Sequence, residues 1–341
     1  MQRTESCLRS NESGKWIARL ACVASIIAAL GGVLMTANAA YALQAPALWV
    51  TSFIGTDIEE FTPADLLANG SPTPVADNTG LRSTGLAFDK DHNLWAILDF
   101  FEVVEYSATE LANLGSDPSP TPVTVITSLS FSSLFGCTFD RKGNLWIADE
   151  DLGVHELLRN QLLGGSALLT PAVTIDVPIF EAVNFLAFDH VGNLWASDED
   201  RVAIYELSKR QIRTSATVTP AVAITSASIS EPGQLAFDRQ DALWVTDFKD
   251  DSVEKFPRKL IRKTGNPAPS VIITASSSNL NGPWGLTFDE SENLWVSNFN
   301  DGKISKYFST QIRKSGNPVP AVTITNPSAD ETYQITFGPA F

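Results

Sequence analysis

The sequence contains very little cysteine and histidine. Of its 341 residues, three are cysteines and three are histidines. Cys7 and Cys22 fall in an N-terminal stretch that we expect to be removed, so the remaining Cys137 has no partner for an internal disulfide. We interpret Cys137 as a small buried hydrophobic residue. Stability must therefore come from an apolar core, for which a hydrophobic content of 44% is sufficient.

Basic residues are also scarce. The chain has 24 lysines and arginines against 39 aspartates and glutamates, and its net charge is −15. A surface this acidic repels phosphate backbones, so we expect no nucleic-acid partner. The same charge suits a soluble protein in a salty exterior, or a protein that attracts cationic ligands.

One long apolar run lies near the N-terminus. A basic segment ends at Arg19, the run extends over residues 20–35, and two Ala-x-Ala sites follow, ending at Ala39 and Ala42. This order predicts a Sec-type signal peptide over residues 1–42, cleaved after Ala39 or Ala42, and a secreted or periplasmic protein. An uncleaved anchor is the alternative, although the run is short for a membrane span. We expect no membrane span once the signal is removed.

The most prominent feature that is present is a repeat. The pair Leu-Trp occurs at intervals of about fifty residues, which is a period typical of propellers, solenoids and other arrays. The copies are Leu48-Trp49, Leu94-Trp95, Leu145-Trp146, Leu194-Trp195, Leu243-Trp244 and Leu294-Trp295. The repeat covers nearly the whole chain, so it determines the predicted fold.

Each repeat unit predicts four strands. An apolar strand ending in Phe-Asp, as in 285–289, is followed by a polar turn and the Leu-Trp strand, which together indicate a β-hairpin. A third strand alternates apolar and charged residues, as in 253–256, and a fourth begins at a proline, as in 320–324. Capping boxes such as 107–110 predict short helical turns between the third and fourth strands.

The two ends of the chain complement each other. The N-terminal unit begins at its Leu-Trp strand, and the C-terminus ends in an orphan first strand, residues 334–337. Joining one C-terminal strand to three N-terminal strands completes a sixth unit and removes exposed sheet edges. We therefore predict an all-β, six-bladed β-propeller with four antiparallel strands per blade over residues 43–341.

The repeated aspartate of Phe-Asp precedes a tight turn, where such a side chain bonds the backbone amides of the turn. We therefore assign structural roles, instead of a catalytic ring of carboxylates, to Asp89, Asp140, Asp189, Asp238 and Asp289. We interpret the repeated tryptophans as apolar cores between the blades.

The loops after the Leu-Trp strands are acidic in neighbouring units, as in 149–151, 198–200 and 247–251. We expect them on one face of the ring, either as a solvated acidic rim or as a site that holds Ca²⁺ or attracts a cationic group. The opposite face should carry the helical turns, which are basic in later units: Lys209, Arg210, Arg213, Arg258, Lys259, Arg262, Lys263, Arg313 and Lys314.

The pattern Gly-Leu-x-Phe-Asp-x-x-x-Asn-Leu-Trp-Val-x-Asp resembles the repeat of NHL-type propellers and of streptogramin-lyase-like and gluconolactonase-like propellers. The similarity covers roughly residues 47–341. It implies the fold, because these motifs are mostly the structural part of each blade.

The resemblance also implies where a site would lie. Gluconolactonase-like propellers carry Glu, Asn and Asp metal ligands at the start of the first strand, where this sequence has Thr84, Phe135, Asn184, Gly233, Trp284 and Tyr333. Only Asn184 fits that role, with Glu181 and Glu231 a few residues upstream of their strands. Streptogramin lyases need His and Glu at the mouth of the central channel. Here His92 and His190 lie in hairpin turns, and His155 lies on a third strand.

Two candidate sites follow from these positions. The first is a partly apolar funnel for a small organic, sugar or peptide ligand, formed by Thr84, Phe135, Asn184, Trp284 and Tyr333. The second is a Ca²⁺ or Mg²⁺ site, formed by Glu181, Asn184, Glu231, Asp198 and Asp247.

Three functions remain open from the sequence. The leading hypothesis is an exported, monomeric scaffold that binds a small ligand or another protein through the funnel face. The alternative is a metal-dependent hydrolase, lactonase or lyase, for which the catalytic residues are unknown. The third is a purely structural envelope protein. The sequence contains no Ser-His-Asp order, phosphate loop or zinc spacing that would favour another enzyme class.

Overall fold

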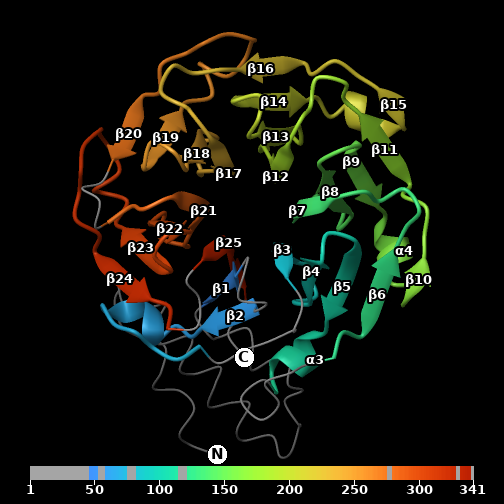
Figure 1. Ribbon diagram of the computed structural model, residues 1–341, viewed down its shortest axis with the longest axis horizontal. Coiled ribbons are helices and arrows are strands. Elements are labelled where there is room, and N and C mark those ends of the chain that lie inside the picture. Colours follow the sequence, from blue (N-terminus) through green and yellow to red (C-terminus); the bar gives the residue numbers. More distant parts are fainter. Residues whose placement is uncertain are drawn as a thin grey trace, which may run out of the picture. The chain divides into compact units, whose positions relative to one another are not determined.

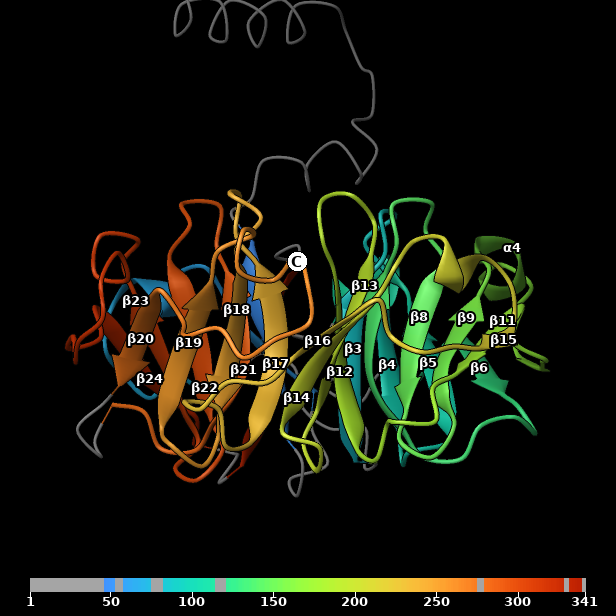
Figure 2. The same ribbon diagram turned by 90° about the horizontal axis from the view of Figure 1, so that it is seen from above.

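Six sheets form a ring in the unit that spans Ala45–Phe341 (Figure 1). The computed structural model describes residues 46–52, 58–74, 82–113, 121–274, 279–327 and 331–338. The predicted signal peptide and its cleavage sites lie outside these residues, so both stay predictions. Figure 2 shows the strands running between the two faces of the ring. The predicted six-bladed propeller is confirmed.

Five blades are antiparallel meanders in sequence order. Blade 1 contains β3 (Ser83–Phe88), β4 (Leu94–Leu98), β5 (Glu102–Tyr106) and β6 (Thr124–Thr127). Blade 2 contains β7 (Leu134–Phe139), β8 (Leu145–Asp149), β9 (Gly153–Leu157) and β11 (Val173–Asp176). Blade 3 contains β12 (Val183–Phe188), β13 (Leu194–Asp198), β14 (Ala203–Leu207) and β16 (Val222–Ile224). Blade 4 contains β17 (Pro232–Phe237), β18 (Leu243–Asp247), β19 (Ser252–Phe256) and β20 (Val271–Thr274). Blade 5 contains β21 (Pro283–Phe288), β22 (Leu294–Asn298), β23 (Lys303–Tyr307) and β24 (Val322–Thr325).

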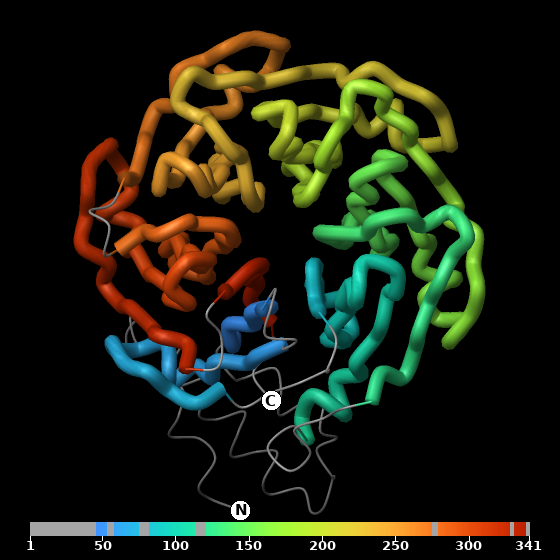
Figure 3. Tube along the Cα trace, in the orientation of Figure 1, coloured from blue at the N-terminus to red at the C-terminus, as the bar shows by residue number. Residues whose placement is uncertain are grey.

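The sixth blade joins the two ends of the repeat region, as Figure 3 shows where the blue and red segments meet. The C-terminal strand β25 (Thr332–Gly338) pairs with β1 (Ala47–Ser52), which pairs with β2 (Ile58–Phe61). Closure by the C-terminal strand is confirmed. The described part of this blade contains two N-terminal strands where the sequence predicts three, and residues 75–81 lie outside the description.

Each repeated tryptophan packs between blades. Its ring meets a phenylalanine near the end of the first strand of the next blade, with centroids 5.5–6.5 Å apart in edge-on geometry. The last of these pairs, Trp295 with Phe337, and the first, Trp49 with Phe88, both involve the closing blade. Aromatic pairs in this geometry stabilise beyond their buried area. The predicted structural role of the tryptophans is confirmed.

The Phe-Asp aspartates also have the predicted structural role. In blade 3, Asp189 Oδ1 accepts hydrogen bonds from the backbone N–H groups of Val191 and Asn193 in the hairpin turn. Its Oδ2 accepts from the indole N–H of Trp195 and from the side chain of Asn193. One carboxylate therefore bonds both the hairpin turn and the core tryptophan, and it holds the turn against the core.

Short helical segments follow the third strand in several blades. They are η1 (Asp65–Leu67), α3 (Ala108–Leu111), α4 (Arg159–Leu162) and η2 (Gln211–Arg213). The predicted capping box at Ser107 and Glu110 is present. After these turns, the chain pairs in parallel with the outer strand of the preceding blade, through β10 (Ala167–Leu168), β15 (Ala216–Thr217) and the bridges at Gly70, Gly265 and Gly316. These bridges join the outer edges of adjacent blades.

The first strands meet around the central axis. A Cβ on Gly85, Gly136 or Gly285 would lie 2.4–2.5 Å from a backbone carbonyl oxygen of the neighbouring first strand. Glycine is therefore required there for the close approach of the strands. Blade 3 has Phe185 at this position instead, and its ring reaches Trp284 and Tyr333, with centroids 6.0 and 5.5 Å away. Phe185 thus occupies the centre of the ring next to the candidate site.

Two further predictions can be checked against the fold. Cys137 is 3% exposed and free of disulfides, and burial raises the pKa of its thiol to about 12, so it is a buried and unreactive residue as expected. Within the described residues, none of the helices has the length and apolar character that crossing a membrane would require.

Candidate functional site

A cavity of about 310 Å³ opens on the face where the Leu-Trp strands end, which we call the funnel face. Its lining comes from blades 2 to 6: Phe135, Glu150, Asn184, Glu199, Glu231, Phe248, Trp284, Phe299 and Tyr333. The set divides by chemistry into five aromatic rings, three carboxyl groups and one amide. We call this cavity the funnel site.

Four lining residues come from a bulge near the start of the first strands. The pairing of each first strand with its neighbour shifts register there, for example between Val183 and Phe185. The residue inside the shift in that blade is Asn184, and its counterparts are Phe135, Trp284 and Tyr333. A bulge turns its extra residue away from the ladder, which places these side chains in the cavity.

Four more come from the position directly after the Leu-Trp strand: Glu150, Glu199, Phe248 and Phe299. These residues were not assigned to the funnel from the sequence. The signal that identifies them is their position, because each follows the aspartate or asparagine that ends its strand. The sequence interpretation treated these loops as a continuous acidic arc and so missed the two phenylalanines.

The aromatic half of the funnel site is a connected cluster. Trp284 lies with its centroid 5.2 Å from Phe248 and 5.5 Å from Tyr333, while Phe299 lies 5.8 Å from Phe248. Trp284 and Tyr333 are mostly buried, and Phe248 and Phe299 are partly buried around them. The cluster presents an apolar, π-rich wall along blades 4 to 6.

The acidic half lies on blades 2 to 4. Glu199 and Glu231 both line the cavity, and their carboxyl groups interact electrostatically. Burial, and then repulsion from Glu231, raises the pKa of Glu199 to about 7, although a hydrogen bond from Asn184 opposes the shift. Burial also raises the pKa of Glu231 above its ordinary value. Glu150 accepts a hydrogen bond from the hydroxyl of Ser133 at 3.0 Å. Two carboxyl groups in contact can share one proton near neutral pH.

Two buried polar atoms in the wall lack a hydrogen-bond partner, Asn184 Oδ1 and Trp284 Nε1. Asn184 is 4% exposed, and its Nδ2 donates to Glu199 Oε2 at 2.7 Å. Its Oδ1 is buried and has no hydrogen-bond partner. A buried acceptor left unpaired costs about 1–3 kcal/mol. A donor on a bound ligand would remove this penalty.

Of the five funnel residues predicted from the sequence, the structure brings four into the cavity. Thr84 is the exception and is not among the residues that line the cavity. Its hydroxyl donates to the backbone oxygen of Leu134 at 3.0 Å, and the side chain is fully buried between blades 1 and 2. A small polar side chain at the bulge bonds the neighbouring strand instead of reaching the funnel.

The five predicted metal ligands do not assemble as a set. Asn184 and Glu231 line the funnel site, but Glu181 is half exposed and forms an ion pair with Arg201 at 2.5 Å. Asp198 and Asp247 are buried beneath the loops that lead into their blades. Asp198 accepts from the backbone N–H groups of Glu181, Ala182 and Arg201, and Asp247 from those of Ser230, Glu231 and Asp250.

The described residues contain no group of three or more His, Cys, Asp or Glu side chains arranged to hold a metal ion. Binding of Ca²⁺ or Mg²⁺ stays a prediction. His155 lies outside the funnel site, as the sequence suggested, and its Nε2 pairs with Asp149 Oδ2 at 3.1 Å in the core of blade 2. Burial opposes ionisation of Asp149, but hydrogen bonds from His155 and Ser132 outweigh it and keep its pKa below the ordinary value.

Comparison with known proteins establishes the fold. No protein-family model matches the chain, and no curated protein matches it. The matched chain of the nidogen/laminin complex is 14% identical with a TM-score of 0.61, over 86% of this chain and 98% of that one. A protein of unknown function from Bacteroides caccae is 11% identical with a TM-score of 0.57, over 86% and 99%.

Virginiamycin B lyase from Staphylococcus aureus is 12% identical with a TM-score of 0.48, over 67% of each chain. The chain has the fold of six-bladed propellers. The predicted resemblance holds for the propeller architecture, which the six sheets show. Identities this low carry no information on activity, so function must be argued from the funnel site.

Proposed function

We propose that this protein is an exported scaffold that binds a small organic ligand with a basic nitrogen in the funnel site. The observation that carries the proposal is the meeting of an aromatic wall with Glu150, Glu199 and Glu231 in one cavity. Export is supported by the basic, apolar and small-residue order of residues 1–42. Sequencing the N-terminus of the mature protein tests it, with Ala40 or Leu43 expected as the first residue.

A basic nitrogen suits both halves of the site. Aromatic faces attract cations by about 0.5–2 kcal/mol when the cation loses water. The carboxylates supply the opposite charge, and Asn184 Oδ1 supplies a buried acceptor for an N–H donor. A cation would also favour ionised Glu199 and Glu231, whose pKa values are raised without one. A neutral sugar would use the aromatic wall but leave these charges unpaired.

Titration calorimetry with benzylammonium and benzyl alcohol tests the charge requirement. The two probes share a ring and nearly a shape, and we expect the amine to bind at least tenfold more tightly, about 1.4 kcal/mol. The double variant Glu199→Gln, Glu231→Gln should remove that preference. Glu181→Gln is the control for each single substitution, because it replaces one glutamate outside the cavity. Equal affinity for amine and alcohol contradicts the proposal.

An acid–base enzyme is the second candidate. It is supported by Glu199 and Glu231 in one cavity and by the pKa of about 7 at Glu199, which suits proton transfer at neutral pH. Hydrolysis of glucono-δ-lactone, followed by acid release, should then be lost in Glu199→Gln. Melting curves with millimolar Ca²⁺, Mg²⁺ or chelator separate a metal-dependent reaction from a metal-free one, because a bound ion stabilises the native state.

A further inference from the structure

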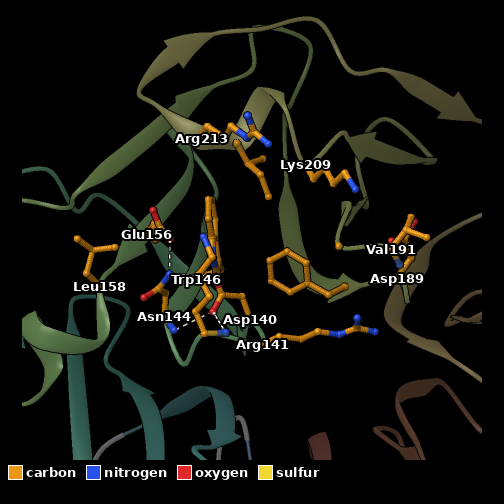
Figure 4. Close-up of a pocket in the computed structure, with 14 residues that line it drawn as sticks. Asp140, Arg141, Asn144, Trp146, Glu156, Leu158, Asp189, Val191, Lys209 and Arg213 are labelled. Atoms are coloured by element: carbon orange, nitrogen blue, oxygen red, sulfur yellow. Dashed lines mark hydrogen bonds between the residues drawn. The ribbon is translucent and has the colours of Figure 1, made fainter.

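A second cavity, of about 570 Å³, lies between blades 2 and 3 at the hairpin turns, the opposite end of the strands from the funnel site. We call it the Trp146 groove. Blade 2 contributes Asp140, Asn144, Trp146 and Glu156 to its wall, and blade 3 contributes Phe188 among others. Figure 4 shows Glu156 and Asn144 side by side next to the Trp146 ring.

The same groove occurs between blades 4 and 5, where it is smaller, about 320 Å³. We call it the Trp244 groove. Asp238, Trp244 and Phe288 take the places of Asp140, Trp146 and Phe188. The two cavities are therefore repeats of one structure, and their differences can be read position by position.

The decisive difference is the residue that faces the tryptophan across the sheet. Lys255 pairs with Trp244 in the strand register, whereas Glu156 pairs with Trp146. The Lys255 ammonium lies 2.8 Å from Asp238 Oδ2 and 5.0 Å from the centre of the Trp244 ring. Lys306 repeats this arrangement in blade 5, 3.4 Å from Asp289 and 4.7 Å from the centre of the Trp295 ring. The chain thus fills two of these grooves with its own ammonium group.

In the Trp146 groove, that ammonium is replaced by a second carboxyl group. Asn144 bridges the two acids, donating to Asp140 Oδ2 at 3.0 Å and to Glu156 Oε1 at 2.8 Å. Burial, and then repulsion from Asp140, raises the pKa of Glu156, whereas the hydrogen bond from Lys255 helps to lower the pKa of Asp238 despite burial.

The tryptophan of this groove also lacks its usual partner. Trp244 donates its indole N–H to Asp238 at 3.0 Å, and Trp95, Trp195 and Trp295 donate to the corresponding aspartates. Trp146 is 2% exposed, and its Nε1 is buried with no hydrogen-bond partner. This groove therefore holds both an acid pair without an ammonium and an unused donor.

Glutamates also face the tryptophan in blades 1, 3 and 6. In blade 3, where Glu206 faces Trp195, Arg258 from blade 4 reaches Asp189 at 2.5 Å. In blade 1, where Glu105 faces Trp95, the hydroxyl of Thr124 donates to the carboxyl group at 2.6 Å, as Asn144 does to Glu156 in blade 2. Blade 2 differs from blades 1 and 3 because Trp146 has no acceptor, whereas Trp95 and Trp195 donate to their aspartates.

The rim of the Trp146 groove is basic. Arg141 and Lys142 belong to the turn of blade 2, and Lys209 and Arg213 belong to blade 3. Figure 4 shows Lys209 and Arg213 across the cavity from Asp140. These groups repel a simple amine but attract a carboxylate. A ligand that satisfies the groove therefore needs both charges.

We propose that the Trp146 groove binds a small primary amine that also carries a carboxylate. Its ammonium takes the place that Lys255 occupies in the Trp244 groove, against Asp140 and Glu156 and over the ring of Trp146. Its carboxylate meets the basic rim. This site is separate from the funnel site and does not depend on the function proposed for it.

Titration calorimetry with 6-aminohexanoate tests the proposal. We expect it to bind at least tenfold more tightly than hexylammonium or hexanoate, because each of these carries one of the two charges. The variant Glu156→Lys should abolish binding while keeping the fold and the melting temperature, because it reproduces the filled Trp244 groove. Glu156→Gln, which changes no volume, should weaken binding at least tenfold.

The reverse substitution is the matched control. Lys255→Glu should remove the ammonium group from the Trp244 groove and add a second binding event for 6-aminohexanoate. The funnel variant Glu199→Gln, Glu231→Gln should leave this binding unchanged, which separates the two sites. The proposal is overturned if hexanoate binds as well as 6-aminohexanoate, or if folded Glu156→Lys binds unchanged.

Discussion

The aspartate that ends a Leu-Trp strand and the residue that follows it are neighbours in the chain with different tasks. Asp149, Asp198 and Asp247 turn back into their own blades and bond the backbone amides of the loop that leads into the first strand. The following residues, Glu150, Glu199 and Phe248, line the funnel site. The aspartate is the same in these three blades because it bonds backbone N–H groups that every blade has. The residue after it differs between blades because it faces the cavity and bonds no repeated feature of the blade.

The two grooves on the opposite face teach the same lesson. Trp146 and Trp244 hold equivalent places, but Glu156 brings a carboxyl group into one groove and Lys255 brings an ammonium group into the other. In both comparisons the repeated residues build the blade. The residues that differ between copies create the sites. The predictions below test this division, beginning with the repeated positions.

Truncating a repeated tryptophan should have the largest effect. Trp195→Ala removes a fully buried ring that packs on Phe237 and bonds Asp189, and we expect a loss of about 3–5 kcal/mol in the free energy of unfolding. Urea unfolding followed by circular dichroism measures it. Leu129→Ala is the control, because Leu129 is 93% exposed and should change stability little. A loss below 1 kcal/mol in the free energy of unfolding of Trp195→Ala would contradict the structural role of the tryptophans.

The adjacent positions in blade 3 provide a direct test of the comparison. Asp198→Ala leaves three backbone N–H groups without their acceptor, and we expect a loss of about 2–3 kcal/mol. Glu199→Gln should cost less than about 1 kcal/mol, since an amide can keep the bond to Asn184 when it adopts the matching orientation. Equal losses at the two positions would contradict the division of roles.

The pH dependence of stability should reveal the carboxyl pair of the funnel site. The folded-state pKa of Glu199, about 7, lies above the ordinary value of 4.5, so the folded state holds the proton more tightly. Its contribution is present below about pH 4.5 and is lost as the pH rises through 7. Asp247, near 6, and Glu254, near 7, act in the same direction. Melting temperatures should therefore fall over this range, and less steeply in Glu199→Gln than in the unmodified protein.

The smallest effect is expected at Thr84. Thr84→Val removes one buried hydrogen bond to Leu134, at a cost of about 1 kcal/mol. Benzylammonium binding should not change, because Thr84 lies outside the funnel site. Calorimetry on the folded variant checks this. A reduced affinity for benzylammonium would show that Thr84 contributes to the funnel site.

Much of the fold could be predicted because its causes are local and repeated. The Phe-Asp turn, the Leu-Trp strand and the capping box at Ser107 each depend on residues within one blade. Ring closure could also be predicted, since the two incomplete ends match. The funnel residues Phe135, Asn184, Trp284 and Tyr333 were located by counting to one position in each repeat.

The failures have a shared physical cause. Glu181 and Asp198 were grouped with Asn184 by closeness in sequence, but one points to solvent and Arg201 while the other bonds backbone. Phe248 and Phe299 were passed over because they interrupt an acidic pattern. The direction of a side chain depends on strand bulges and loop bonds, which spacing in the sequence does not show.

By itself, the sequence determined the number of blades, their strand order, their aromatic cores and the structural use of the Phe-Asp carboxylates. These follow from hydrogen bonds and packing that recur in every unit. Only the tertiary structure decided which of the differing residues meet. The funnel site gathers residues from 135 to 333 because the ring brings the ends of five blades to one axis. The Trp146 groove carries a second carboxyl group because Glu156 stands where Lys255 brings an ammonium group into the Trp244 groove.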